Sequence, residues 1–375
     1  MKGAAGSRAR RGPVSGVQLV AAGLALTDGG LGVVGRLLVG ALGDVCQARG
    51  VPLGVFHFGS EEQVPPAAVP IRHFGRRSWR LWGAVTALEL RRAARLLVFD
   101  HLGPASIQAT IPPPLRAPYL VYVHGIEAWG TLSPRRQKAL EGAAAAMVNS
   151  AYTAHRARLD QLGVAWTVVP PALESRPPSG AVADELLSRA GCGFVVIVGR
   201  MSGAERYKGH DLLLEAMPQL RRRIPAARLV VVGEGDDRPR LQRKAAELGV
   251  DGAVLFTGWV SEATRAALLR QAAVLALPSR SEGFGLVYLE AMEAGLPCVG
   301  LAGTAAAEII VDGETGFLVD GTPEALAVAL ERLLGNGATA RRMGASGRER
   351  LLQRFGVERF RAGVEEAVTA VWGGS

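Results

Sequence analysis

The sequence predicts an α/β protein made of two doubly wound domains, each built on a parallel sheet. Short apolar runs alternate with helix-like segments in both halves of the chain, which is typical of βαβ units. The Pro/Ser-rich stretch 170–178 interrupts this alternation and is the expected interdomain linker. With 375 residues, 49% of them hydrophobic, the chain is long enough for two or three domains that each bury a core.

The first half begins with residues 1–15, which we expect to be a disordered tail. A signal peptide is the alternative, but Gln18 interrupts the apolar run and no clear cleavage site follows. A turn at Gly29–Gly32 and a helix to about Ala48 are expected after the first strand. The predicted strands are Val17–Leu24, Val51–Phe58, Leu96–Phe99, Leu120–His124, Ala145–Asn149 and Trp166–Val169.

The second half repeats the alternation. After Pro323 the pattern is helical to Trp372, with a glycine-rich pause near 335–337. The predicted strands are Phe194–Val198, Arg228–Val232, Ala253–Phe256, Val274–Leu277, Pro297–Gly300 and Phe317–Val319.

The composition narrows the class of protein. The three cysteines, Cys46, Cys192 and Cys298, are too few and too far apart for a disulfide framework or a metal site, which favours a reducing compartment. No run approaches 18 uninterrupted apolar residues, so no membrane-spanning helix is expected. Residues 1–175 carry 19 Lys/Arg against 10 Asp/Glu, whereas residues 176–375 carry 24 of each. The excess positive charge of the first half favours an anionic surface or acceptor.

The stretch Pro278–Pro297 concentrates the groups that could bind a phosphorylated ligand. An apolar strand leads into a Ser/Gly-rich loop, and a helix leads out from about Phe284. The helix N-terminus offers free N–H groups, and Gly283 and Gly285 let the backbone approach a phosphate closely. Glu282 and Glu290 lie at the two ends, roughly 10 Å apart along the helix. This is about the span of a nucleotide diphosphate sugar, whose vicinal hydroxyls suit carboxylate acceptors.

The string Glu282-Gly-Phe-Gly-Leu286, with Glu290, resembles the Glu–seven–Glu motif of family-4 retaining glycosyltransferases. The resemblance covers nearly the whole chain after residue 15 and is strongest over 199–319. It implies the GT-B fold, which has two Rossmann-like domains with a cleft between them. The expected division is 16–172 for the acceptor domain, 173–355 for the donor domain, and 356–375 for a helix that crosses back to the first domain.

Further motifs fit the same resemblance. In the family, Arg200 and Lys208 would hold the diphosphate, although the longer loop here leaves Arg206 as an alternative, and a solvated basic loop is the plain structural explanation. His124 ends a strand, where a ligand crevice is expected, and would contact the donor sugar; a structural histidine is the alternative. Gly303–Glu308 resembles the closing motif, with Thr304 in place of a second glycine. The expected donor-binding residues are Gly30, Gly32, Gly199, Val260, Gly283, Phe284, Gly285, Leu286 and Glu290; the expected catalytic residues are His124, Arg200, Lys208 and Glu282.

Arginines between 72 and 95 could form a second kind of site. If a helix starts near Arg77, then Arg77, Arg80, Arg91 and Arg95 would share one side of it, close to Trp79. Such a stripe suits an anionic membrane surface. A solvated helix face is the alternative.

The resemblance implies transfer of a hexosyl group from a nucleotide diphosphate sugar to an acceptor hydroxyl, with retained configuration, no metal and no cofactor. The expected acceptor is a saccharide or a lipid-linked sugar in cell-envelope polysaccharide, lipopolysaccharide or glycolipid synthesis. A cytoplasmic protein is expected, with peripheral attachment to the inner face of the membrane left open. Another GT-B nucleotide-sugar enzyme, such as an epimerase, and a non-catalytic partner subunit remain alternatives. Nucleic acid is not an expected partner, because binding to it would leave the motifs of 199–319 unexplained.

Overall fold

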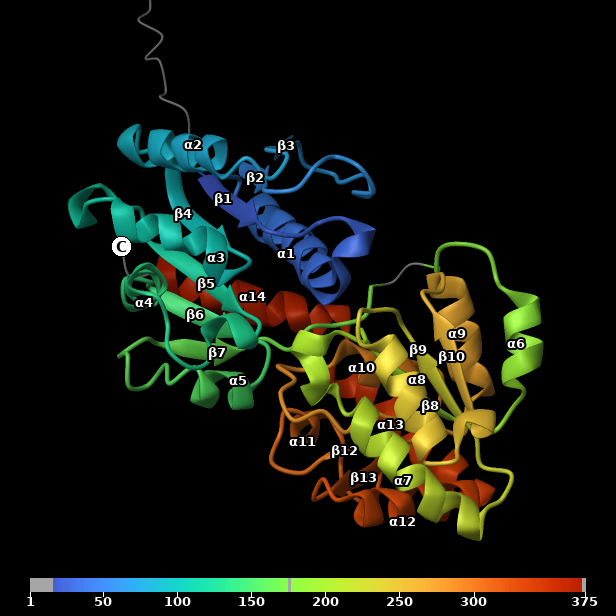
Figure 1. The fold of residues 1–375 in the computed structure, drawn as a ribbon. Coiled ribbons are helices and arrows are strands. Elements are labelled where there is room, and N and C mark those ends of the chain that lie inside the picture. The colour runs from blue at the N-terminus through green and yellow to red at the C-terminus, as the bar shows by residue number, and fades with distance from the viewer. Residues whose placement is uncertain (1–15, 175–176, 373–375) are drawn as a thin grey trace, which may run out of the picture.

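The first domain is built on a seven-stranded parallel sheet with the order β3-β2-β1-β4-β5-β6-β7 (Figure 1). The computed structural model describes residues 16–174 and 177–372. The strands are β1 (Gly16–Ala21), β2 (Leu53–His57), β3 (Ile71–His73), β4 (Ala94–Phe99), β5 (Tyr119–Val123), β6 (Ala145–Val148) and β7 (Trp166–Val168). The α-helices are α1 (Gly29–Ala48), α2 (Ser78–Leu90), α3 (Leu102–Ala105), α4 (Pro134–Glu141) and α5 (Ala151–Arg156).

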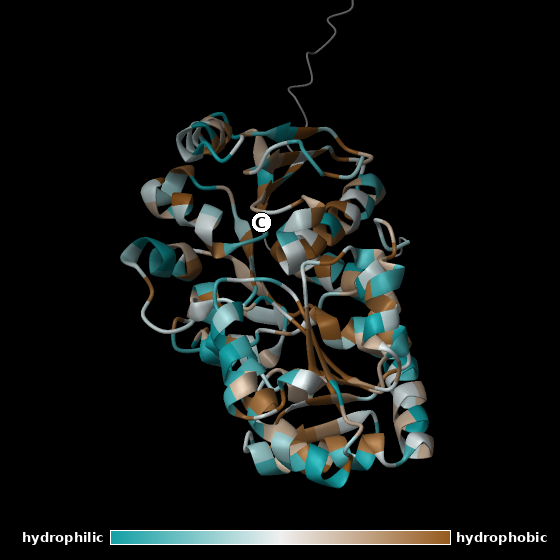
Figure 2. Cartoon of the chain, turned by 45° about the vertical axis from the view of Figure 1, so that its right-hand side comes forward, coloured by the Kyte–Doolittle hydropathy of each residue, from teal (hydrophilic) through white to brown (hydrophobic). Residues whose placement is uncertain are grey.

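The second domain is built on a six-stranded parallel sheet with the order β10-β9-β8-β11-β12-β13. Its strands are β8 (Val195–Val198), β9 (Leu229–Val232), β10 (Val254–Gly258), β11 (Val274–Ala276), β12 (Cys298–Leu301) and β13 (Gly316–Val319). Its α-helices are α6 (Asp184–Ala190), α7 (His210–Arg223), α8 (Arg238–Glu247), α9 (Glu262–Gln271), α10 (Leu286–Glu293), α11 (Ala306–Ile309), α12 (Pro323–Leu334) and α13 (Gly337–Arg354). Figure 2 shows apolar strands inside, with polar residues on the outer sides of the helices.

The predicted fold class is confirmed, because both sheets are parallel and covered by helices. All twelve predicted strands are present, with ends shifted by a few residues. Strand β3 was missed because its three residues, Ile71–His73, include an arginine and a histidine and so present no apolar run. The predicted turn at Gly29–Gly32 is wrong: these glycines form the first turn of α1, and the chain turns earlier, in the 3-10 segment Leu26–Asp28.

Helix α1 packs against one face of the first sheet. Leu38, Ala41, Leu42 and Val45 are buried in the same core as β1 and β4. Within the described residues, Leu26–Ala48 is long and apolar enough to cross a membrane, with a mean hydropathy of 1.4. The uninterrupted-run criterion did not reveal this helix, because Asp28, Arg36 and Asp44 interrupt the apolar residues without lowering the average hydropathy enough. Half of that window is buried inside the protein.

The last helix returns to the first domain. After α13 the chain turns at Phe355 and Gly356, and α14 (Val357–Trp372) packs against α1, β6 and β7. Its buried residues Phe360, Val364 and Val368 belong to the first domain's core. Figure 1 shows α14 in red beside β5 and β6. Helix α14 therefore crosses back from the second domain to the first.

The predicted basic stripe between Arg77 and Arg95 is wrong. Helix α2 ends at Leu90, because Arg92 adopts a positive φ of 49°. Arg91 therefore lies beyond the helix, and Arg95 lies in β4, where its guanidinium carbon stacks 4.7 Å from the centre of the Trp372 ring. Arg77 and Arg80 remain near the start of α2, beside the exposed Trp79. Too few of these arginines share one face to define a membrane surface.

Candidate active site

A cleft of about 470 Å³ lies between the two domains. Residues that follow β5 and β6 line one wall, and residues that follow β8 and β11 line the other. In open parallel sheets the ligand crevice lies at these carboxyl ends of the strands, where the strand order reverses. The polar residues that line it are Arg36, His101, His124, Glu127, Asn149, Arg200, Glu205, Tyr207, Lys208, Glu262, Arg265, Glu282 and Glu290.

The loop before α10 brings the two domains into contact. Gly283 O accepts hydrogen bonds from Ser150 Oγ at 2.7 Å and Thr153 Oγ1 at 3.2 Å, both from the first domain. A Cβ at Gly283 would lie 1.9 Å from His124 O, so only glycine fits there. Gly285, at a φ of 93°, is the N-cap of α10, and no side chain caps the helix. The N–H groups at this helix start remain available to an anion in the cleft.

Lys208 supplies the positive charge closest to that helix start. Its Nζ lies 3.4 Å from Glu282 Oε2, and its side chain is 15% exposed. Arg200 lines the same wall from the start of the loop but is largely exposed and pairs with Glu205. Arg206 bonds to Asp237 instead and does not line the cleft. The loop therefore presents Arg200 and Lys208, rather than Arg206, to a ligand.

Glu290 lies near the middle of α10 and is held by an arginine. Arg265 of α9 donates to both of its carboxylate oxygens, at 2.9 and 3.0 Å. Burial raises the pKa of Glu290, while the Arg265 guanidinium lowers it. The paired carboxylate is ordered and faces the cleft, which is the arrangement needed to accept hydrogen bonds from a pair of ligand hydroxyls.

Two partly buried histidines, His101 and His124, and the buried Asp100 lie together on the first domain's side of the cleft. The Nε2 atom of His124 lies 2.7 Å from Asp100 O, and its ring centre lies 5.8 Å from that of His101. Desolvation lowers the pKa of His124, and it lowers the pKa of His101 to about 4. Asp100 accepts Ala22 N–H at 2.6 Å, and burial raises its pKa to about 7. Both histidines are therefore neutral at pH 7 and available as hydrogen-bond groups.

Mild acid should destabilise this fold through its histidines. Desolvation lowers the pKa of His57, His101 and His210 from 6.5 to about 4, so the unfolded chain binds more protons between these values and stability falls as the pH falls. Asp100 acts in the opposite direction, because its raised pKa lets the folded state take up a proton below about 7. Asp100 offsets one of the three histidines. The other two should lower the free energy of unfolding by about 3 kcal/mol for each pH unit near pH 5.

Urea unfolding at pH 7 and pH 5 measures this change. Equal transition midpoints at the two pH values would contradict the assignment of neutral, buried histidines.

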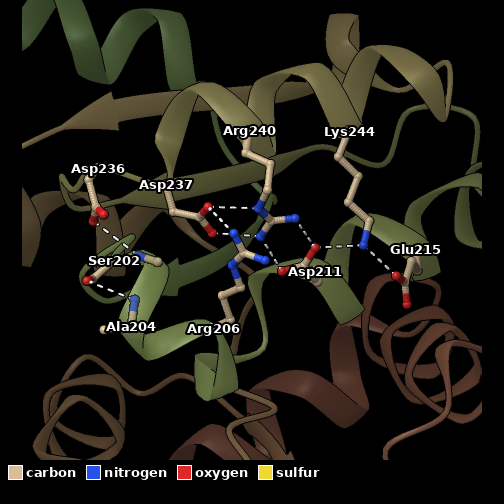
Figure 3. A network of polar contacts seen from close by, with 10 residues as sticks. Ser202, Ala204, Arg206, Asp211, Glu215, Asp236, Asp237, Arg240 and Lys244 are labelled. Atoms are coloured by element: carbon tan, nitrogen blue, oxygen red, sulfur yellow. Dashed lines mark hydrogen bonds and ion pairs between the residues drawn. The ribbon is translucent and has the colours of Figure 1, made fainter.

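A network of charged side chains holds the loop that carries Arg200 and Lys208 (Figure 3). Arg240 donates to both oxygens of Asp211 at 2.7 Å and to both oxygens of Asp237 at 2.6 and 2.7 Å. Asp211 starts α7 directly after the loop, and Asp237 N donates to Met201 O inside it. These bonds lower the pKa of Asp211 to about 2. Arg240 thus ties together both ends of the loop.

Replacing Arg240 with methionine should loosen the loop. Arg240→Met keeps an unbranched side chain but removes the guanidinium that donates to both oxygens of Asp237, which is 6% exposed. The expected cost is about 2 kcal/mol of unfolding free energy, together with a several-fold rise in the KM for the donor. Arg243→Met, an exposed arginine on the same helix, is the control. Identical denaturation curves and KM values for the two variants would disprove this role.

The closing motif, Gly303–Glu308, does not line the cleft. Its Glu308 instead accepts the N–H groups of Ala151 and Tyr152, at 2.9 and 2.7 Å, and so caps helix α5 of the other domain. This is a second contact between the domains, beside the one at Gly283. The Thr304 hydroxyl bonds to Leu301 O within its own loop.

The structure brings most of the expected residues into the cleft: His124, Arg200, Lys208, Glu282, Gly30, Gly283, Phe284, Gly285, Leu286 and Glu290. Three others lie outside its lining, namely Gly32, Gly199 and Val260. Gly32 is buried in α1, and a Cβ there would lie 2.4 Å from Ala25 O. His101, Asn149 and Arg265 were missed. Asn149 ends a predicted strand and His101 follows one, so strand ends could have indicated them, whereas Arg265 projects from a helix and gave no signal.

Comparison with known proteins identifies this architecture. Residues 185–350 match the family model described as glycosyl transferases group 1, so this part of the chain is similar to that family. Sucrose-phosphate synthase from Thermosynechococcus elongatus has the same fold, with a TM-score of 0.74 over 96% of this chain and 100% of that chain, at 21% identity. Anabaena Alr3699/HepE, in complex with UDP and glucose, has a TM-score of 0.74 over 95% and 100%, at 19% identity. The described residues, 16–174 and 177–372, therefore have the GT-B fold.

One group of relatives is more similar in sequence. The GDP-mannose-dependent alpha-(1-6)-phosphatidylinositol monomannoside mannosyltransferase of Mycolicibacterium smegmatis is 37% identical over 179 residues. The match covers 46% of this chain and 47% of that protein, so it spans about half the length of each.

Proposed function

We propose that the protein is a glycosyltransferase that moves a hexosyl group from a nucleotide diphosphate sugar to an acceptor hydroxyl. The observation that carries the proposal is the meeting of Lys208, Glu282 and the uncapped start of α10 in one interdomain cleft. A diphosphate fits between them, because it would receive N–H groups from the helix and the charge of Lys208. Glu290, one turn further along α10, is placed to accept hydrogen bonds from the ribose hydroxyls.

The reaction breaks the bond between the anomeric carbon and the diphosphate oxygen, so negative charge grows on the leaving group. Lys208, Arg200 and the α10 N-terminus stabilise that charge. His124 would hold the transferred sugar from the other wall, with Asp100 O fixing its ring. These groups make a metal unnecessary, and retention of configuration follows from the resemblance to family-4 enzymes.

The acceptor is proposed to be a lipid-linked sugar or a phosphoinositide of the cell envelope. Support comes from the Mycolicibacterium smegmatis relative, which is named for a phosphatidylinositol monomannoside, and from the excess of positive charge on the first domain. The protein would meet this acceptor at the cytoplasmic side of the membrane, as a peripheral enzyme.

Release of nucleoside diphosphate tests the proposal. The protein is incubated with GDP-mannose or UDP-glucose, with and without a phosphoinositide acceptor, in buffer that contains EDTA. Release that needs the acceptor and persists in EDTA is expected, and NMR of the product should show the donor's anomeric configuration. Conversion of the donor sugar without any acceptor would indicate an epimerase instead.

A further inference from the structure

A groove of about 630 Å³ runs along the first domain, outside the cleft. Its two walls are the outer side of α1, with Val39 and Gly40, and the segment Val64–Val69, which contains two prolines. Leu53 and Ile71 of the sheet edge close its floor. We call this hollow the α1 groove; the proposed reaction uses none of these residues.

The α1 groove is apolar, and its helix wall is smooth. Gly40 and Gly43 are in the lining of the groove, and a Cβ built on either would find no atom within 4 Å. The segment Leu26–Ala48 has a high mean hydropathy and is only half buried, so the two glycines leave open space beside the apolar side chains that line the groove. A flexible hydrocarbon chain fits such a surface, because it needs no polar partner.

The charged side chains that line the α1 groove are already paired. Arg36 donates to both carboxylate oxygens of Glu174, at 2.6 and 2.8 Å. Asp44 lies 3.2 Å from Arg361 of α14. A charged group inside the groove would compete with these pairs, whereas a hydrocarbon chain would leave them intact. The charge distribution therefore favours an apolar chain in the groove, with any charged head group outside it.

The α1 groove lies next to the cleft. Arg36 lines both hollows, and its Nη1 donates to Leu24 O and Ala25 O at 2.9 Å, in the loop that leads to Gly29 and Gly30 of the cleft. A molecule whose polar head reacts in the cleft could thus extend a tail over this loop into the groove.

We propose that the α1 groove binds a fatty acyl chain of the acceptor lipid while the acceptor's sugar lies in the cleft. This inference rests on the proposed function, since it names the class of acceptor that the same cleft would use. Each methylene that enters the groove should tighten binding about fourfold.

Calorimetric titration of the full chain with decanoate and hexanoate tests the groove without any transfer reaction. Decanoate should bind at least tenfold more tightly than hexanoate, and Gly40→Leu should weaken decanoate binding at least tenfold by filling the groove. Gly83→Leu is the matched control, because Gly83 lies on α2, equally free of neighbours and away from the groove. Both substitutions favour helix formation, so both proteins should fold. No decanoate binding to the wild type, or equal binding to both variants, would overturn the proposal.

A competition experiment then identifies the chain's source. Dioctanoyl phosphatidylinositol should displace decanoate from the wild type, whereas glycerophosphoinositol, which has the same head group without acyl chains, should not. Failure of the dioctanoyl lipid to displace decanoate would overturn the assignment to an acceptor chain. Failure of the transferase assay alone would leave the decanoate result unchanged, so the two ideas fail separately.

Discussion

Replacing Lys208 with alanine should lower kcat about a thousandfold, which is the usual effect of removing one preorganised group that stabilises a developing charge. Lys208 is 15% exposed and lies 3.4 Å from Glu282, beside the uncapped start of α10. Without it the leaving diphosphate keeps the N–H groups of the α10 start and Arg200, which is far more exposed. The measurement is the initial rate of nucleoside diphosphate release at saturating donor and acceptor.

Two further variants make this result specific. Lys138→Ala removes an exposed lysine from α4, far from the cleft lining, and should keep the wild-type rate. Lys208→Arg keeps the charge but changes its geometry and should recover only part of the rate. A Lys208→Ala protein with a kcat within tenfold of the wild type would exclude this lysine from the reaction.

Substituting alanine for Gly283 should lower activity about a hundredfold while leaving the fold intact. The new Cβ would lie 1.9 Å from His124 O and 3.0 Å from Asn149 Nδ2, so the two walls of the cleft must separate. A displacement of about 1 Å at a reacting centre can cost a factor of about a hundred. Each domain keeps its own core, so the thermal midpoint should change little.

Gly252→Ala provides the matched control for Gly283→Ala, because no atom lies within 4 Å of a Cβ at that position. The two proteins are compared by kcat/KM and by thermal unfolding. Equal kcat/KM values would show that the close approach of Gly283 to His124 does not matter for turnover.

The fold was largely predictable because parallel strands buried on both faces leave continuous apolar runs. Strand β11, for example, is fully buried and stands out as Val274–Ala276. Edge strand β3 is partly exposed and lacks this signal. The end of α2 depends on the positive φ of Arg92, a backbone conformation that no sequence period reveals.

The residues of the candidate site were predictable where they lie close together in the sequence. Lys208, Glu282 and the α10 start come from two continuous loops, so their residue types and spacing identify them. Contacts between distant elements were not predictable. Glu308 capping α5, Arg265 holding Glu290, and Arg240 joining Asp211 to Asp237 all depend on how helices pack.

The most direct test of the central idea, that this cleft binds a nucleotide diphosphate through Lys208, is a thermal-shift panel with UDP, GDP and ADP sugars. A ligand that binds only the native state at a hundredfold excess over its Kd adds about 2.7 kcal/mol of stability. We predict that one nucleotide class raises the melting temperature of the wild type and of Lys138→Ala, and that Lys208→Ala loses this rise. No shift with any of the three, or an equal shift in Lys208→Ala, would contradict it.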